Sequence, residues 1–455
     1  MIENPVVNQE QLGRIRDKLS VMSTLFDRLQ LSASLGQQFG GDRDMYEILG
    51  YPLMMGFADY LGKYTRQDVA GKVVDLPAID TWRKPAIIED GKSSTEQDDP
   101  ISPFVRDLKA IINKRRLWHY LQRADRLSGI GRYGVLLIGV RGDIPMNQEI
   151  PAGALKGAGD VIYLSVFSES SAAIKSLDQD PKSERFGLPL AYDVKFTSGS
   201  PAQEVHWSRC IHLAEDLMED EVYGRPRLER VYNLLEDLLK IVGGGAEATW
   251  KVMDQGMQAN IQEGYTGESQ TLDDLEEEID EYLHGLRRFI RTQGVDIKQL
   301  GSQVVDPSGL FNIIISLVSA ASGIPQRILI GSERGELASS QDAANWAGII
   351  RARQTQFAEP MVLRPLIDRL ITFGALAKPE GGYTVDWPSL FEMSDTQRSE
   401  VALNYSQAIA GIAPPGAAEA VVPIPEFREH FLGLPALSPE EAVLDEEDQQ
   451  GDESE

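Results

Sequence analysis

The stretch LVSAASGIPQRILIGSERGELASSQDAANW, residues 317–346, lies between two segments with helical patterns. The apolar run that leads into it favours a helix over residues 307–322. Inside the stretch, a polar, glycine-bearing loop carries Arg327, Glu333, Arg334 and Glu336. The loop lacks the G-K-[ST] sequence of a P-loop, so a phosphate cradle of that kind is not expected.

A long helix is predicted after this loop. Ser339 and Asp342 fit a helix start of the capping-box type, and the helical pattern continues to about residue 374. Pro360 and Pro365 lie inside the pattern. Because proline removes a backbone donor and clashes with the preceding turn, we expect this helix to kink rather than run straight.

An amphipathic helix is also predicted upstream, over residues 227–253. Its apolar residues recur at helical offsets, at Leu228, Val231, Leu235, Leu238 and Val242. The glycines at 243–245 are expected to weaken or bend it. Between this helix and the one at 307–322, TLDDLEEEIDEYLHGL (271–286) predicts another amphipathic helix with a densely acidic face, and a strand-like segment follows it.

The N-terminal half predicts a mixture of helices and strands. YTRQDVAGKVVDLPAIDTWRKP (64–85) has apolar residues at helical spacing and stops at a proline, and residues 101–127 predict one long helix. Four segments have the pattern of strands, namely 135–140, 162–168, LAYDVKFT (190–197) and VHWSRCIHL (205–213). The predicted fold class is therefore α+β, with mostly non-local pairing.

The segment GIGRYG, residues 129–134, matches the G-x-G-x-x-G pattern of dinucleotide-binding proteins. That pattern needs a strand before the glycines and a helix after them, so that the pyrophosphate meets a helix N-terminus. Here the predicted helix comes before the glycines and the strand after them. We interpret the glycines as a tight helix-to-strand turn and predict no cofactor.

The composition bounds the function. The 455 residues favour several domains or one elongated multi-part subunit, and an apolar fraction of 42% suffices for real cores. The net charge of -26 argues against static gripping of DNA phosphates, although not against a surface past which DNA slides. The single cysteine, Cys210, favours a reducing compartment. The apolar stretch 313–324 is shorter than the roughly 18 residues of a membrane helix, so we predict a soluble, intracellular protein without a membrane partner.

No pattern typical of a catalytic or metal site occurs in the sequence. The five histidines include no HxxxH or HExxH pair, and HWS at 206–208 is the single H-x-[ST] motif, whereas a two-histidine phosphoesterase needs two. We expect His206 and His212 to lie in a strand pair instead. The carboxylates between 273 and 281 are interpreted as a solvated helix face. We therefore predict no catalytic residues, no metal and no enzyme activity.

Three stretches together resemble tailed-bacteriophage portal proteins, in particular a portal-like family labelled as a domain of unknown function. Residues 64–85 are similar to the N-terminal signature of that family, and GRPRLERVYNLLEDLLKIVGGGAEATWK (224–251) resembles its first stem helix. In residues 317–346, a G-I-P, an apolar run ending in Gly331 and a glycine-bearing loop before an aromatic helix also occur in the family. The three stretches come in the family's order and span most of residues 45–375.

The resemblance implies a multi-part subunit that assembles into a ring, a dodecamer in the family, around a central channel at one capsid vertex. The implied parts are an N-terminal arm (1–40), a wing (41–226), a first stem helix (227–253), a clip (254–306), a second stem helix (307–322), a tunnel loop with the long kinked helix and the rest of the wing (323–394), a crown (395–438) and an acidic tail (439–455). The implied partners are further copies of the chain, the terminase large subunit, head–tail adaptor or neck proteins, the major capsid protein and double-stranded DNA in the channel. The implied location is the virion, and the host cytoplasm during assembly.

The resemblance also implies which residues meet DNA and neighbouring subunits. The tunnel loop would present Arg327, Ser332, Glu333, Arg334, Gly335 and Glu336 to DNA, and the stem helix would contribute Lys240 and Lys251. A closed ring needs two different complementary faces on each subunit, and the basic segment 114–132 would supply one of them through Arg115, Arg116 and Arg123. The alternative interpretation of that segment is a surface helix paired with acidic neighbours of its own chain.

An acidic channel suits this role, because acidic walls repel phosphates and do not hold the DNA that passes. Two other functions stay open at this point. One is a phage structural adaptor without a channel. The other is a phage nuclease or phosphodiesterase, which would need clustered carboxylates or paired histidines.

Overall fold

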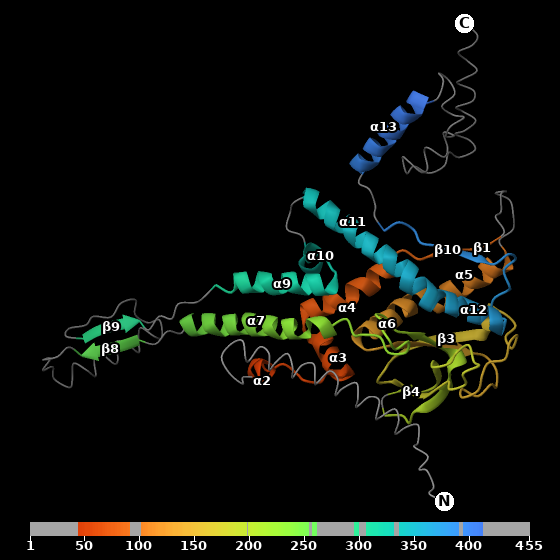
Figure 1. Ribbon diagram of the computed structural model, residues 1–455, viewed down its shortest axis with the longest axis horizontal. Helices are drawn as coiled ribbons and strands as arrows, with labels where there is room; N and C mark the ends of the chain where they lie inside the picture. The colour runs from red at the N-terminus through yellow and green to blue at the C-terminus, as the bar shows by residue number, and fades with distance from the viewer. Residues whose placement is uncertain are drawn as a thin grey trace, which may run out of the picture. The chain divides into compact units, whose positions relative to one another are not determined.

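A computed structural model describes residues 44–91, 102–197, 199–253, 257–261, 295–299, 306–331, 336–390 and 395–412 (Figure 1). The chain divides into two compact units, one up to Trp387 and one from Pro388. The α-helices of the first unit are α2 (Met45–Leu49), α3 (Phe57–Arg66), α4 (Asp68–Thr81), α5 (Pro103–Arg115), α6 (Leu117–Ile130), α7 (Tyr232–Met253), α9 (Ser308–Ser322), α10 (Gln326–Ile330), α11 (Glu336–Arg353) and α12 (Arg364–Phe373).

The strands of this unit are β1 (Ile87–Asp90), β2 (Gly134–Val140), β3 (Val161–Ser168), β4 (Ala172–Leu177), β5 (Pro189–Val194), β6 (Gln203–His206), β7 (Cys210–Leu213), β8 (Met257–Ile261), β9 (Val295–Gln299) and β10 (Tyr383–Asp386). They form two three-stranded sheets, β3-β2-β7 and β4-β5-β6, and two two-stranded sheets, β1-β10 and β8-β9. All strand pairs are antiparallel. The predicted α+β class with non-local pairing is confirmed.

The central strand β2 is buried at every position, which explains its uninterrupted apolar sequence. Because successive side chains of a strand point to opposite faces, β2 serves two cores. Leu136 and Ile138 pack into the core formed with helices α5, α6 and α12. Val135 and Leu137 pack into the core shared with the second three-stranded sheet. The glycines of residues 129–134 form the helix-to-strand turn that the sequence predicts, since α6 ends at Ile130 and β2 begins at Gly134.

The segment VHWSRCIHL is not one strand. β6 ends at His206 and pairs with β5, whereas β7 begins at Cys210 and pairs with β2. A 3-10 turn over Trp207–Arg209 lets the chain change sheets, and the side chain of His206 accepts a hydrogen bond from the Ser208 amide across it. The expectation that His206 and His212 lie in one strand pair is therefore wrong.

The prediction of a single helix over residues 101–127 is also wrong, because the helix is interrupted at Arg116, which separates α5 from α6. Arg116 has a left-handed conformation with φ 52°. On a straight helix, the side chains of Ile111 and Leu117 would point about 120° apart around the axis. The break turns both side chains into the same core, where each is about 1% exposed.

The helices predicted over residues 227–253 and 307–322 are present and lie side by side as α7 and α9 (Figure 1). A 3-10 turn over Glu229–Val231 precedes α7, so the regular helix starts later than the predicted residue 227. The helix is unbroken through the glycines at 243–245. Leu235 of α7 and Ile315 and Val318 of α9 are fully buried in the described structure, as expected for the inner faces of two amphipathic helices.

The long helix after the loop has three segments. It begins at Glu336, earlier than the predicted start at Ser339. Between α11 and α12, Gln354–Leu363 form a π-helical segment that contains Pro360. Pro365 lies in the first turn of α12, directly after this segment, and has no backbone N–H to donate to the preceding turn. The expected irregularity at the prolines is thus present, as a π-helical segment.

The described part of the second unit is helix α13 (Asp395–Ile412), the beginning of the helical region predicted from 394. The predicted arm, the helix at 271–286, the region beyond residue 412 and the acidic tail lie outside the described residues. Across the described helices, none combines the length and apolar character needed to cross a membrane.

Candidate functional site

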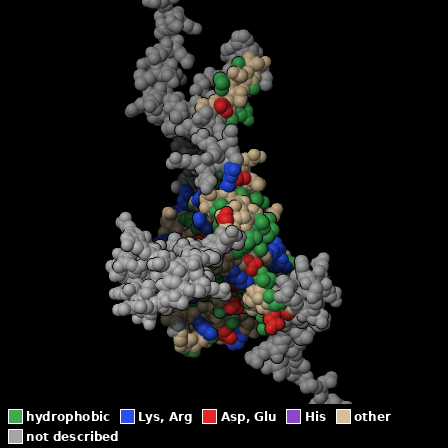
Figure 2. Space-filling view, turned by 90° about the vertical axis from the view of Figure 1, so that its left-hand side faces the viewer, with side chains coloured by type: hydrophobic (Ala, Val, Ile, Leu, Met, Phe, Trp, Pro, Cys, Tyr) green, Lys and Arg blue, Asp and Glu red, His purple; other side chains and the backbone are tan. Residues whose placement is uncertain are grey.

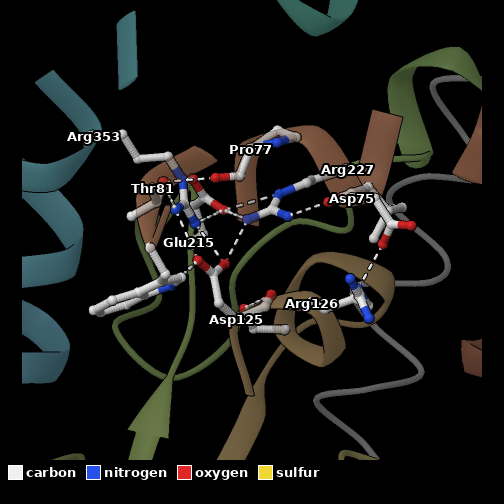
Figure 3. Close-up of polar contacts among 11 residues, drawn as sticks. Asp75, Pro77, Thr81, Asp125, Arg126, Glu215, Arg227 and Arg353 are labelled. Carbon is white, nitrogen blue, oxygen red and sulfur yellow. Dashed lines mark hydrogen bonds and ion pairs between the residues drawn. The ribbon is translucent and has the colours of Figure 1, made fainter. Parts of the chain in front are cut away.

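A buried cluster of charged side chains is the most unusual feature of the first unit (Figure 3). Arg353, at the end of α11, donates to both oxygens of Asp125, from Nη2 to Oδ1 at 2.6 Å and from Nη1 to Oδ2 at 2.9 Å. Its Nε and Nη2 also donate to the carboxylate of Glu215, at 2.6 and 2.9 Å. Nη1 further donates to Thr81 Oγ1 at 2.6 Å. One guanidinium thus bonds to two carboxylates and a hydroxyl.

A second guanidinium, that of Arg227, completes the cluster. Its Nη2 donates to Asp125 Oδ1 at 2.7 Å and to Glu215 Oε2 at 2.5 Å, and its Nη1 donates to the backbone carbonyl of Val74 at 2.7 Å. The indole N–H of Trp82 donates to Asp125 Oδ2 at 2.7 Å. The cluster therefore contains two positive and two negative charges, and Asp125 itself is fully buried.

The charges hold each other in the ionised form. Burial alone would raise the pKa of Glu215, but the charges of Arg227 and Arg353 outweigh it and hold that pKa well below its usual range. Burial alone would lower the pKa of Arg353, and Asp125 and Glu215 raise it instead. A buried charge that lost its partner would cost several kcal/mol, roughly 3–5 in measured cases.

The cluster joins parts of the chain that are far apart in sequence. Thr81 and Trp82 end helix α4, Asp125 lies on α6, and Glu215 follows β7. Arg227 lies just before the turn into α7, and Arg353 ends α11. The segment that leads into α7 and the end of α11 are thus bonded to the same two carboxylates.

A family model described as phage portal protein matches residues 59–410. The chain belongs to the phage portal protein family. The match covers α7, α9, the charged cluster and the long helix in one continuous stretch, which confirms the resemblance noted in the sequence.

Two curated relatives of this portal family chain are called anti-CBASS protein Acb1. The one from Sphingomonas paeninsulae is 24% identical over 361 residues, covering 74% of this chain and 54% of the relative. The one from Caulobacter sp. (strain RHG1) is 23% identical over 423 residues, covering 83% of this chain and 62% of the relative. The portal family chain thus spans less than two thirds of the length of either relative.

Solved structures share the fold. The neck of a native gene transfer agent particle, computed with C12 symmetry, has a TM-score of 0.51 at 13% identity, covering 89% of this chain and 99% of that chain. An HK97 family phage portal protein from Corynebacterium diphtheriae has a TM-score of 0.35 at 9% identity, covering 73% and 94%. The first of these likenesses supports the mixed helix-and-sheet portal fold.

The predicted tunnel loop falls largely outside the described residues, at Ser332, Glu333, Arg334 and Gly335. Helix α11 begins at Glu336. On the other side of the loop, Gly331 has φ 93°, a conformation that favours glycine. Arg327 of α10 lies 3.7 Å from Asp342 of α11. This ion pair connects the helices before and after the loop.

The structure describes the side chain of only one of the two lysines predicted to meet DNA from the stem helix. Lys240 of α7 donates to the carbonyl of Leu49 and to Asp237 Oδ1, and its Nζ lies 4.6 Å from the centroid of the Tyr51 ring. Within the subunit it therefore ties the stem helix to the segment after α2. The backbone of Lys251 belongs to α7, while its side chain lies outside the described residues.

The basic segment is divided by the break at Arg116. Arg126 pairs with Asp75 at 2.6 Å, as the surface-helix interpretation expects. The guanidinium of Arg123 lies 5.5 Å from the Tyr120 ring centroid, and the Nε of Arg115 is buried without a hydrogen-bond partner. Within the part of the chain that the structure describes, Arg115, Arg116 and Arg123 form no ion pair.

Sequence reasoning missed the charged cluster. One signal was present, because Asp125 falls on the apolar face of a helix together with Leu121 and Ser128, where a charge needs a partner. The described residues place no group of three or more His, Cys, Asp or Glu side chains where it could hold a metal ion. Burial lowers the pKa of His212 to about 4, and its Nε2 lies 2.7 Å from the Val222 carbonyl. It is a neutral histidine of the interior.

Proposed function

We propose that this portal family chain assembles into a closed ring whose central channel passes double-stranded DNA into and out of a phage capsid. The observation that carries the proposal is the outward face of the paired helices α7 and α9. Both helices present apolar side chains that are 48–72% exposed, on α7 at Leu239, Val242 and Trp250 and on α9 at Leu310, Ile313 and Leu317. Figure 2 shows hydrophobic side chains gathered in patches between basic and acidic ones. A protein that stays monomeric rarely exposes such faces.

The two apolar faces also suit ring geometry. A ring of identical subunits closes by a heterologous contact, in which one surface of a subunit meets a different surface of the next. The outer face of α7 and the outer face of α9 are two such surfaces on adjacent helices. The charged cluster around Asp125 supports a rigid subunit, because it ties the base of α7 to the end of α11.

The oligomeric state of the purified chain tests this function. We expect native mass spectrometry to find one large oligomer and negative-stain images to show rings with a central hole. Monomers or small dimers at high protein concentration would contradict the ring. In the capsid, we propose that the ring contacts the terminase large subunit, head–tail adaptor or neck proteins and the major capsid protein.

We propose that Arg115, Arg116 and Arg123 meet an acidic surface of the neighbouring subunit. Reversing two charges, in R115E/R116E, is expected to weaken the ring most at low salt, because exposed charges separated by more than about 10 Å are screened at 0.1 M salt. The readout is the fraction of rings in native mass spectrometry as a function of salt. An R115E/R116E chain whose rings persist at both low and high salt would assign these arginines to another role.

We propose that residues 331–340 project toward the DNA, with Glu333, Arg334 and Glu336 nearest to it. The motivation is the position of these residues, which form the connection after α10 and the start of α11, two helices joined by the pair of Arg327 and Asp342. The variant with alanine at the three positions is expected to package or retain DNA poorly while its rings assemble normally. Packaging at the wild-type rate would show that the loop is only a connection between the helices.

The two named relatives raise the question of which part of their length this chain corresponds to. The portal family match spans residues 59–410, and the matches to the two anti-CBASS proteins cover 74% and 83% of the chain, so they overlap. We infer that the shared part is the portal subunit and propose no catalytic role for it. Metal-dependent cleavage of nucleic acid by the purified chain would overturn this inference and favour the nuclease alternative.

A further inference from the structure

A second group of arginines, one buried and two half-buried, lies at the turn where the chain changes sheets. The guanidinium of Arg185 lies 3.6 Å from the centroid of the Trp207 indole ring, and that of Arg369, from α12, lies 5.0 Å from it. Arg209, two residues after Trp207, is 2% exposed. We call these four residues the arginine–tryptophan cluster.

The hydrogen bonds of the three guanidinium groups go to backbone carbonyls. Arg369 donates to the carbonyls of Trp207 and Cys210 at 3.1 and 2.5 Å. Arg209 donates to the carbonyl of Ile144 at 2.8 Å, and Arg185 donates to that of Pro189 at 2.9 Å. In the described regions of the chain, none of the three forms an ion pair with a carboxylate. In the cluster around Asp125, by contrast, two carboxylates face two arginines.

Carbonyl dipoles satisfy N–H groups but do not neutralise a charge. The Nε atoms of Arg185 and Arg209 are buried without a hydrogen-bond partner. Burial lowers the pKa of Arg369 to about 10, with a further contribution from the like charge of Arg185. The carboxylate of Asp178 acts electrostatically on Arg185, and that of Glu149 acts on His206. Neither carboxylate lies within ion-pair distance of an arginine of the cluster. Among the described residues, these three positive charges therefore have no ion-pair partner, in a chain whose net charge is -26.

We propose that the arginine–tryptophan cluster binds the carboxylates of an acidic peptide segment of a partner protein. The planar fork of a guanidinium matches a carboxylate with two parallel hydrogen bonds. Arg185, Trp207 and Arg369 are each only half-buried, so an approaching carboxylate can reach the outer edge of the cluster. A bound carboxylate compensates charge that the fold itself leaves unpaired.

The surroundings favour a peptide over nucleic acid. Bases bind single-stranded-DNA proteins by stacking on aromatic rings, and here two guanidinium groups already lie against the indole ring of Trp207. Duplex DNA needs an extended basic surface, and this chain is strongly acidic. Next to Arg185 and Pro189 in sequence, Phe186 and Leu190 are 59% and 37% exposed and offer apolar contacts to a peptide. This inference does not depend on the proposed ring or channel.

Binding of labelled hexaglutamate to the full-length chain tests the proposal, with hexaglutamine as the uncharged probe. At low salt, fluorescence anisotropy is expected to show binding of hexaglutamate and none of hexaglutamine. In R185Q, the affinity is expected to fall about tenfold or more, the usual effect of losing a hydrogen bond to a charged group. R185K keeps the positive charge but lacks the planar guanidinium, so its affinity for hexaglutamate is expected to lie between those of the wild type and R185Q.

R141Q is the matched control, because Arg141 is 70% exposed, lies 3.7 Å from Asp160, and belongs neither to this cluster nor to the proposed subunit contact. R141Q is expected to bind hexaglutamate like the wild type, and circular dichroism checks that each variant is folded. The same titration with inorganic phosphate and with a short DNA duplex separates the ligand classes. The proposal is overturned if hexaglutamate does not bind, if R141Q loses as much affinity as R185Q, or if the duplex binds at this cluster and the peptide does not.

Discussion

Replacing Asp125 by asparagine is expected to destabilise the first unit by about 3–5 kcal/mol, the loss typical of a buried ion pair that loses one partner. Asparagine keeps the volume of the side chain and can still accept the bond from Trp82, so the change removes chiefly the charge. Arg227 and Arg353 would then share the single carboxylate of Glu215. At about 2–4 °C per kcal/mol, the melting temperature should fall by roughly 10 °C, as measured by circular dichroism.

A nearby ion pair provides the control for this prediction. Arg126 and Asp75 are 2.6 Å apart, but their side chains are 31% and 29% exposed (Figure 3). Pairs of this kind contribute about 0–1 kcal/mol, so R126M should melt within a few degrees of the wild type. If D125N lost no more stability than R126M, the cluster around Asp125 would not hold the subunit together.

The same cluster predicts how stability depends on pH. The folded-state pKa of Glu215 lies well below its ordinary value of 4.5, chiefly because two guanidinium charges outweigh the effect of burial. The stability that Glu215 contributes is thus fully present above pH of about 5 and is lost as the pH falls toward the folded-state pKa. Between pH 7 and pH 3, the difference in melting temperature between the wild type and E215Q should therefore shrink. A constant difference would show that the charge of Glu215 is not responsible.

The order of apolar and polar residues predicted those parts of the fold that depend on residues close together in the sequence. The apolar run around Leu136 and Ile138 predicts a buried strand, and the period of Leu235 and Leu238 predicts a stem helix with one apolar face. The three stretches that resemble portal proteins predicted the family, because their order along the chain reflects the order of the parts. These features depend on near neighbours in sequence, and the sequence pattern records them.

The remaining features depend on residues that are far apart in the chain. The left-handed conformation of Arg116 lets Ile111 and Leu117 pack into one core, and the helical pattern on either side gives no sign of the break. The change of sheets after His206 follows from pairing with β5 and β2, which alternation alone does not distinguish. Asp125 could be suspected from its apolar helix face, but nothing local marks Arg353 as its partner.

Substituting aspartate for Ile313 is expected to abolish the ring while leaving the subunit folded. Ile313 is 58% exposed on the outer face of α9, so aspartate at this position costs the isolated subunit little. In the proposed ring the side chain is buried against α7 of the next subunit. Each interface then loses roughly 1.5–3 kcal/mol of apolar burial and must also bury an unpaired carboxylate. Because the loss recurs at every interface, we expect only monomers and small oligomers at micromolar concentration.

The control is an aspartate on another exposed apolar residue. Met218 is 74% exposed and lies in the connection before α7, where its sulfur accepts a hydrogen bond from Arg225. An aspartate there can pair with Arg225, and M218D should form rings like the wild type in native mass spectrometry. Unchanged melting of I313D together with loss of its rings would assign the outer face of α9 to the subunit contact. Intact rings in I313D would place the contact on other surfaces, and the apolar stem faces would then need a different partner.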